Sequence, residues 1–308
     1  MPPCHPLDVA KQTLAEKLPA LSVEQRQAEV RLLVEAVFQL PYSALLTKSA
    51  DFFTTEAFQP AWQQLHTLLE DRTIHRTPLQ YLLKQAWFLG RPFFVSPAVL
   101  IPRPETELLV EAALGLITPS AKAEAPFRWA DVGTGSGCLA ISLALALQEH
   151  YPSVQFTGIA TDISAEALQV AQHNADELKV ASQAIAFLLA DVLTPLDTSE
   201  KPPVGLDLIL SNPPYINPIL APTLAPEVLK HEPAGALFSG DCGFEVVRKL
   251  IVQASIALKP DGFLLIEVGS GMAKTVADWA VTQASFTVLS VWSDYAGHER
   301  FLTLQRKG

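Results

Sequence analysis

Asp131-Val132-Gly133-Thr134-Gly135-Ser136-Gly137-Cys138 is the stretch that decides the fold, because it joins a strand-like run to an apolar helix. Residues 128–132 form the strand-like run, and the apolar residues 138–147 follow the glycines. Glycines at such a junction let the backbone turn sharply and leave room for a ligand against the helix N-terminus. In an open α/β sheet, this position is the crevice in which ligands bind.

The spacing of the glycines favours one class of ligand. The pattern is G-x-G-x-G, whereas the dinucleotide fingerprint G-x-G-x-x-G requires a glycine where Cys138 stands. NAD is therefore disfavoured, and a loop without lysine argues against nucleoside triphosphate hydrolysis. An adenosine ligand without a pyrophosphate remains the better candidate. The alternative is a tight turn that needs only backbone freedom.

Strand-like and helical segments alternate from residue 127 onward. The strand-like runs are residues 128–132, 155–161, 184–189, 206–211 and 263–268. This alternation predicts a parallel α/β sheet with helices on both faces. Two further runs, residues 286–292 and 300–304, are close enough in sequence to form antiparallel neighbours.

The first part of the chain shows helical periodicity and almost no strand signal. Ser22 and Gln25 fit a capping box. Apolar residues recur at the spacing of one helix face in two segments: Val30, Leu33, Val34, Val37 and Phe38, then Trp62, Leu65, Leu68 and Leu69. We predict a small helical domain over residues 1–76.

Residues 77–104 have a different character. Two short extended runs, 87–89 and 93–95, flank Gly90-Arg91-Pro92, which predicts a β-hairpin. The predicted organisation is therefore a helical domain (1–76), a hairpin linker (77–104) and an α/β domain (105–308).

Charge and composition exclude several classes of protein. The net charge of −10 argues against holding duplex nucleic acid through its phosphates. Cys4, Cys138 and Cys242 show no C-x-x-C spacing, so we expect neither a metal site nor disulfides. The first residues lack the features of a secretory signal, and the longest apolar run is shorter than the roughly 20 residues that cross a bilayer. We expect a cytoplasmic protein.

Acidic residues stand at the ends of the next two predicted strands. Asp162 can accept hydrogen bonds from both ribose hydroxyls of a nucleoside, although it could also cap the helix that follows. Asp191 can accept from an exocyclic amine of adenine, and Val192 can pack on its ring. For Asp191 the alternative is a carboxylate that caps a loop.

Asn212-Pro213-Pro214-Tyr215 follows the buried strand of residues 206–211. The two prolines remove two N–H donors, so the loop presents carbonyl acceptors beside the Asn212 side chain. If the Asn212 side-chain oxygen and the Pro213 carbonyl accept both protons of a planar NH2 group, they orient its nitrogen toward a methyl donor. Tyr215 supplies a flat face for stacking. A rigid strand-to-loop turn without chemistry is the alternative.

These motifs and several other segments together resemble the release-factor glutamine N5-methyltransferase family. The segments that match are residues 76–81 (Arg-Thr-Pro-Leu-Gln-Tyr), 99–107 (Val-Leu-Ile-Pro-Arg-Pro-Glu-Thr-Glu), 131–138, 211–216, 231–233 (His-Glu-Pro) and 236–237. The resemblance covers nearly the whole chain. It implies a Rossmann-like class I S-adenosylmethionine methyltransferase domain with a mixed seven-stranded sheet, a small N-terminal helical bundle and a β-hairpin linker.

The resemblance also implies an activity, a cofactor and partners. The expected reaction transfers methyl from S-adenosylmethionine, leaving S-adenosylhomocysteine, to the glutamine side chain in the Gly-Gly-Gln loop of peptide chain release factors. Residues Gly133 to Gly137, Asp162, Val192 and Asn212 would contact the cofactor, and Asn212 to Tyr215 would hold the glutamine. The helical domain would grip the release factor, without direct contact to nucleic acid or membrane, and we expect a monomer.

Arg103-Pro104-Glu105-Thr106 separates the chain from the related enzyme for a ribosomal protein, whose segment is similar to Pro-Arg-Ser-Pro. For Arg103 and Glu105, a substrate contact and a salt-bridged helix start are equally good interpretations.

Two positions depart from the family pattern. Val192 stands where some members have an aromatic residue, and Met272 stands where Gly269-Ser270-Gly271 is often followed by Gln. We expect Val192 to pack less well on adenine than an aromatic ring would.

Two other functions fit the same motifs. A DNA adenine N6-methyltransferase would use the same acceptor geometry on a flipped base, but the acidic charge argues against it. A non-catalytic binding module would keep the cofactor fold, but it would not need Asn212.

Overall fold

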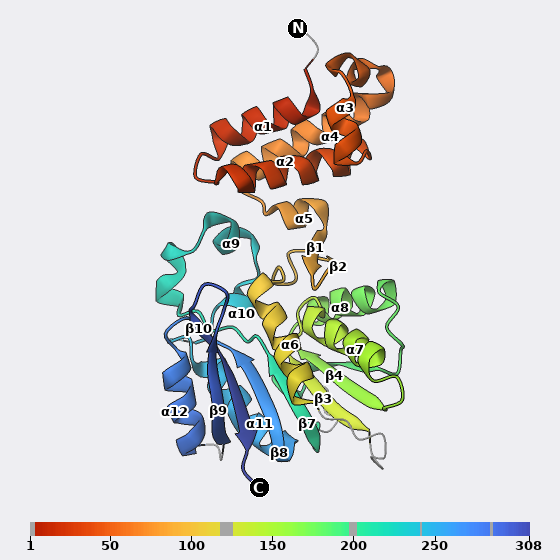
Figure 1. The fold of residues 1–308 in the computed structure, drawn as a ribbon. Coiled ribbons are helices and arrows are strands. Elements are labelled where there is room, and N and C mark those ends of the chain that lie inside the picture. The colour runs from red at the N-terminus through yellow and green to blue at the C-terminus, as the bar shows by residue number, and fades with distance from the viewer. Residues whose placement is uncertain (1–3, 118–125, 197–201, 241, 284–285) are drawn as a thin grey trace. The chain divides into compact units, whose positions relative to one another are not determined.

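The computed structural model describes residues 4–117, 126–196, 202–240, 242–283 and 286–308 (Figure 1). The chain divides into two compact units. One comprises Met1–Gln85 with Ala225–His231, and the other comprises Ala86–Leu224 with Glu232–Gly308. No helix in the described ranges is long and apolar enough to cross a membrane. The borders at residues 76 and 104 remain a proposal.

The first unit is a bundle of helices. It contains α1 (Pro6–Lys17), α2 (Val23–Phe38), α3 (Tyr42–Thr47), η1 (Ala50–Thr54), η2 (Glu56–Phe58), α4 (Gln59–Glu70), η3 (Asp71–His75) and α5 (Leu79–Leu83). The predicted capping box is present, because Ser22 and Gln25 exchange side-chain to backbone hydrogen bonds. All five apolar residues predicted on one face of α2 are buried, as are Leu65 and Leu69 of α4. These faces make the core of the bundle.

Helix α9 (Pro226–His231) belongs to this helical unit although it follows β7 in the chain. The Arg72 side chain is 5% exposed and donates to Glu29 at 2.8 and 2.9 Å and to Glu227 at 3.0 Å. Arg76 also pairs with Glu227 at 2.7 Å. Local sequence patterns do not predict this insertion, because Arg72 and Glu227 lie 155 positions apart.

The predicted hairpin is present as β1 (Gln85–Phe88) and β2 (Arg91–Phe94). The turn consists of Leu89 and Gly90, whereas the sequence suggested residues 90–92. Leu89 and Gly90 have φ angles of 47° and 70°. Positive φ at both positions is what a two-residue turn needs to match the twist of its strands, so Arg91 and Pro92 fall within β2.

The second unit is built on a mixed sheet. Its strands are β3 (Phe127–Val132), β4 (Phe156–Asp162), β5 (Ile185–Asp191), β6 (Thr194–Pro195), β7 (Leu206–Ser211), β8 (Leu258–Glu267), β9 (Phe286–Ser293) and β10 (Glu299–Arg306). The strand order is β6-β5-β4-β3-β7-β8-β10-β9. From β5 to β8 the neighbours are parallel, and β10 is antiparallel to both β8 and β9. The predicted seven-stranded Rossmann-like sheet is confirmed, with the two-residue β6 added at one edge.

Helices cover both faces of this sheet. The helical elements are η4 (Pro104–Thr106), α6 (Glu107–Leu116), α7 (Cys138–His150), α8 (Ala165–Glu177), η5 (Pro218–Thr223), α10 (Ala234–Leu237), α11 (Glu245–Ala257) and α12 (Ala273–Gln283). Leu210 and Leu265 pack with α6 and α7, while the adjacent Ile209 and Ile266 pack with α11 and α12. Strand side chains alternate between faces, so both faces are apolar.

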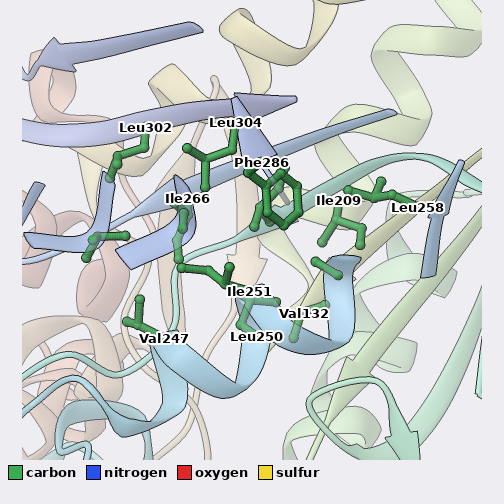
Figure 2. Packing of buried hydrophobic residues seen from close by; sticks show 14 of the residues in the cluster. Val132, Ile209, Val247, Leu250, Ile251, Leu258, Ile266, Phe286, Leu302 and Leu304 are labelled. Atoms are coloured by element: carbon green, nitrogen blue, oxygen red, sulfur yellow. The ribbon is translucent and has the colours of Figure 1, made fainter. Parts of the chain in front are cut away.

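Figure 2 shows the core on the second of these faces. Val247, Leu250 and Ile251 of α11 are directed at the sheet, where they form one buried cluster with Ile266 of β8 and Leu304 of β10. Strands β3, β4, β5, β7 and β8 pair in parallel, so their carboxyl ends meet at one edge of the sheet. Every strand-end motif predicted from the sequence follows one of these strands.

Candidate active site

The glycine loop between β3 and α7 is fixed by backbone hydrogen bonds to the neighbouring strand. The N–H groups of Gly133 and Thr134 both donate to the carbonyl of Thr161, at 2.9 Å each. Gly137 precedes α7 with a φ of 80°, and a Cβ at this position would lie 3.1 Å from the Cβ of Ala171. Position 137 therefore requires glycine both for its conformation and for the close approach of α8. At Gly133 and Gly135, by contrast, the space that a side chain would fill is open.

Asp131 lies buried behind this loop. Its Oδ2 accepts from Thr134 Oγ1 at 2.7 Å and from the Ala140 N–H at 3.1 Å. Its Oδ1 is buried without a hydrogen-bond partner among the described residues. Burial raises the pKa of Asp131 to about 7, and the charge of Asp162 acts in the same direction. Negative charge at this point is therefore poorly compensated by the described protein groups.

Asp162 connects the ends of β3 and β4. Its Oδ2 accepts from the Gly135 N–H and its Oδ1 from the Ser164 N–H, both at 2.9 Å. Burial raises the pKa of Asp162, and these backbone hydrogen bonds oppose the rise. The helix cap of α8 is Ser164, which accepts from the Ala167 N–H at 3.1 Å. The alternative interpretation of Asp162 as a helix cap is therefore wrong.

At the end of β5, the carboxylate of Asp191 already has a partner. Asp191 forms an ion pair with Lys249 of α11, and both side chains are partly exposed. The next residue, Val192, has a φ of 63°, an unfavourable conformation for a β-branched side chain. The Thr161 hydroxyl donates to the Val192 carbonyl at 2.7 Å and helps to hold this conformation. No sequence motif pointed to Lys249 or to Ile163, an apolar residue directly after Asp162 that is 61% exposed.

The Asn-Pro-Pro-Tyr loop begins where β7 ends beside β3. Ser211 Oγ donates to the Val132 carbonyl at 2.7 Å, which fixes the start of the loop to the strand before the glycines. Burial, together with the charge of Glu267, raises the pKa of Tyr215 to about 12, so its hydroxyl stays neutral. The Tyr215 ring lies against Gly269, where a Cβ would come within 3.2 Å of its Cδ2. Gly269 is also close to Met272, the residue that stands where the family often has Gln. The substitution at position 272 therefore lies next to the glycine that packs against the Tyr215 ring.

A buried hydrogen-bond chain reaches Asn212 from two other elements. Asn212 Nδ2 donates to Thr106 Oγ1 at 3.0 Å, and Thr106 Oγ1 donates to Glu267 Oε2 at 2.7 Å. Thr106 is 3% exposed and Glu267 is 2% exposed. Neither residue was predicted to belong to the site. The signal for Glu267 was a glutamate that ends the otherwise apolar run of residues 263–266.

Arg103 and Glu105 have different surroundings. Arg103 Nη2 pairs with Glu232 Oε1 at 2.7 Å, and the other Glu232 oxygen accepts from the Ile101 N–H at 3.3 Å. Arg103 is therefore paired with the His-Glu-Pro segment of residues 231–233, and no ion pair joins it to Glu105 within the described chain. Arg103 is thus salt-bridged at the start of η4, as the structural interpretation expects, but its partner is Glu232 and not Glu105.

One cavity brings several predicted residues together. It is lined by Leu100, Pro102, Arg103, Thr106, Gly133, Thr134, Gly135, Ser136, Cys138, Leu139 and Asn212. The glycine loop, Arg103 and Asn212 therefore line one cavity. Glu105, Asp162, Asp191, Val192 and Tyr215 do not line this cavity. Asp162 is nonetheless joined to it through the Gly135 N–H.

Comparison with known proteins gives a consistent result. A family model described as a methyltransferase domain matches residues 127–305. A release factor glutamine methyltransferase of Moorella thermoacetica is 36% identical over 96% of this chain and 99% of that protein. Proteins with the same name from Bradyrhizobium diazoefficiens and Deinococcus radiodurans are each 34% identical. The first match covers 97% of this chain and 95% of that protein, and the second covers 98% of both.

Proposed function

The chain belongs to the release factor glutamine methyltransferase family, and we propose that it methylates the side-chain nitrogen (N5) of the glutamine in the Gly-Gly-Gln loop of release factors. S-adenosylmethionine supplies the methyl group and leaves as S-adenosylhomocysteine. The observation that carries the proposal is the shared cavity, which is lined both by residues of the glycine loop and by Asn212. A methyl donor and an acceptor nitrogen have to meet in one such space.

The residues around the glycine loop fit S-adenosylmethionine. The loop leaves open space in front of Gly133 and Gly135, where any side chain would intrude. Burial raises the pKa values of Asp131 and Asp162, as expected for carboxylates whose charge is incompletely balanced. The cofactor carries a sulfonium and an ammonium group, so its positive charges would stabilise both carboxylates. We propose that residues Gly133 to Gly137 and Asp162 hold it.

The adenine end of the cofactor would lie beyond Asp162. We propose that Asp191 and Val192 contact the adenine, with Asp191 as a shared hydrogen-bond acceptor. Because Lys249 already pairs with the Asp191 carboxylate, an adenine amine would have to share that acceptor. The exposed Ile163 side chain offers an additional apolar surface for the ring.

We propose that Asn212, Pro213, Pro214 and Tyr215 hold the glutamine amide. The chain from Asn212 Nδ2 to Thr106 leaves the Asn212 Oδ1 as the acceptor for a substrate N–H. The lone pair of an amide nitrogen is delocalised, so orientation of the NH2 group by two acceptors is the main contribution that these residues can make. The neutral Tyr215 ring is suited to stacking on the flat amide. The proton can leave the nitrogen after methyl transfer, so no strong base is required beforehand.

Arg103 is a better candidate for a substrate contact than Glu105. Arg103 lines the cavity and its guanidinium is positioned by Glu232, whereas Glu105 does not line the cavity. We further propose that the helical domain grips the release factor, that the enzyme acts as a monomer, and that it works in the cytoplasm, where release factors act.

Peptide mapping of a release factor after incubation with the enzyme and S-adenosylmethionine tests the proposal. We expect a single added methyl on the glutamine of the Gly-Gly-Gln loop. Labelled methyl on duplex DNA with none on the release factor would instead identify an adenine methyltransferase. Cofactor binding without any methylation would identify a binding module.

A further inference from the structure

In the buried hydrogen-bond chain Asn212–Thr106–Glu267, each donor and acceptor is fixed, and this order determines which atom Asn212 offers to the substrate. The three residues come from the loop after β7, from η4 and from the end of β8. A carboxylate can only accept hydrogen bonds, and a threonine hydroxyl carries a single proton. With Glu267 ionised, the Thr106 proton points to Glu267 Oε2, so Thr106 Oγ1 can only accept from Asn212.

This direction removes the ambiguity of a carboxamide. An asparagine side chain has an oxygen and an NH2 group at almost equivalent positions, and a rotation of 180° exchanges them. A hydroxyl that can only accept selects the orientation with Nδ2 toward Thr106. Asn212 Oδ1 then points away from Thr106 as a hydrogen-bond acceptor. The opposite orientation would present an NH2 group to the NH2 group of the substrate.

We propose that Thr106 and Glu267 are positioning residues that fix the orientation of the Asn212 carboxamide, so that Oδ1 accepts a proton of the substrate amide. This inference rests on the proposed function of Asn212. Neither residue need touch the substrate, because both act through Asn212. Through Thr106, the Arg103-Pro104-Glu105-Thr106 segment becomes part of the amide-binding site.

The charge state of Glu267 determines whether the orientation of the Asn212 carboxamide is fixed. Burial raises the pKa of Glu267 to about 7, although the Thr106 hydrogen bond and the positive charge of Arg300 lower it. The other charges that act on Glu267 are Glu105, which raises its pKa, and Arg103, which lowers it. Arg300 is itself paired with Asp294, and Arg103 with Glu232. The remaining titratable neighbour, Tyr215, is neutral across this range.

When Glu267 is protonated, the hydrogen-bond chain no longer selects one orientation of the Asn212 carboxamide. Its hydroxyl can donate to Thr106 Oγ1, and the Thr106 proton is then able to donate to Asn212 Oδ1 in the rotated carboxamide. Both orientations become compatible with the chain. Turnover at saturating S-adenosylmethionine should therefore fall as the pH drops through about 7. Cofactor binding follows the separate titration of Asp131, so kcat has to be measured at saturating cofactor at every pH.

Three variants separate positioning from simple loss of structure. Thr106→Val removes both hydrogen bonds at almost constant volume, Thr106→Ser restores the hydroxyl, and Glu267→Gln removes the charge. We expect Thr106→Val to lower kcat about 10- to 100-fold, by the loss of orientation, with cofactor affinity within about threefold by calorimetry. Thr106→Ser should recover most of the lost kcat.

The pH profile provides the second readout. Wild-type kcat should show an acid limb near pH 7, and Glu267→Gln should lower kcat at pH 8 and lack that limb. Glu177→Gln, an exposed glutamate on α8, serves as the matched control and should keep the wild-type profile. Wild-type kcat in Thr106→Val, no recovery in Thr106→Ser, or an unchanged acid limb in Glu267→Gln would overturn the inference.

Nuclear magnetic resonance observes the asparagine without turnover. The chain has only three asparagines, Asn174, Asn212 and Asn217, so asparagine-selective 15N labelling yields three side-chain NH2 signals. The Asn212 signal, assigned by its loss in Asn212→Ala, should shift with pH near 7 in wild type and lose this dependence in Thr106→Val. Asn174, held by Phe94 and Ser136, is the internal reference.

These measurements separate two failures. An Asn212 signal that does not respond to pH in an active wild-type enzyme would refute the positioning role alone. A wild-type protein that never methylates a release factor would refute the proposed function, and the pH-dependent signal would still report on the hydrogen-bond chain.

Discussion

The backbone N–H of Gly135 donates to Asp162 Oδ2 at 2.9 Å, which ties the loop after β3 to the end of β4. The same carboxylate accepts from the Ser164 N–H through Oδ1. Each carboxylate oxygen has two acceptor positions, so each can still accept one ligand hydroxyl. Asp162 thus shapes the glycine loop and remains available to a ribose.

Asp162→Ala should weaken binding of S-adenosylmethionine. Hydrogen bonds to a charged group contribute about 1.5 to 3 kcal/mol, so we expect the dissociation constant to rise roughly 10- to 100-fold in calorimetry. At saturating cofactor, kcat should stay within a few-fold of wild type. Wild-type affinity in this variant would show that Asp162 serves the loop alone.

Binding of S-adenosylmethionine should release protons from Asp131. Burial raises the pKa of this carboxyl to about 7, so about half of the molecules carry the proton at pH 7. A positively charged ligand stabilises the ionised form and lowers that pKa. Calorimetry in two buffers of different ionisation enthalpy should therefore detect a release of up to about half a proton per site.

Two controls accompany the proton measurement. S-adenosylhomocysteine lacks the sulfonium charge and should release less, and Asp131→Asn should release almost none. Equal proton release by Asp131→Asn and wild type would assign the titration to another group.

Asn212→Ala should abolish methyl transfer while leaving cofactor affinity largely intact. Loss of an orienting group at the reacting nitrogen can lower the rate about 100-fold or more. The measurement is kcat on a release factor together with calorimetric binding of S-adenosylmethionine. A parallel loss of both quantities would mean that Asn212 mainly serves the cofactor.

Glu267→Gln should stabilise the second unit at alkaline pH. The folded pKa of about 7 lies above the usual 4.5, so the folded state holds its proton while the unfolded state loses it between these values. Stability from this group is fully present below about pH 4.5 and is lost as the pH rises through about 7. The variant should therefore gain up to about 3 kcal/mol at pH 8 and little at pH 4.5. Thermal unfolding at both values measures this, and a larger gain at pH 4.5 would contradict the sign.

Arg72→Met should destabilise the helical unit. It would leave the carboxylates of Glu29 and Glu227 without their buried partner, which typically costs about 3 to 5 kcal/mol. Arg31→Met is the control, because its pair with Glu35 is exposed and should contribute less than about 1 kcal/mol. Urea titration followed by circular dichroism compares the two. Equal effects would show that the Arg72 cluster does not anchor α9.

Local patterns of the sequence are sufficient for the elements and their order. The period of 3.6 identified the buried face of α2, and the capping box marked its first turn at Ser22. The alternation of strands and helices predicted the parallel sheet, and the glycine spacing placed a ligand loop after β3. Even here local rules missed the Leu89–Gly90 turn, because a leucine at positive φ is uncommon.

The motif Asn212 to Tyr215 showed by itself that a planar NH2 group could be held, and the resemblance over the whole chain selected glutamine. Only the tertiary structure joined Asn212 to Thr106 and Glu267, paired Asp191 with Lys249, and placed Glu227 beside Arg72. Backbone conformation and periodicity depend on neighbours within a few positions, so one sequence reveals them. The partner of a buried polar side chain is chosen by the packing of distant segments, and that choice exists only once the chain has folded.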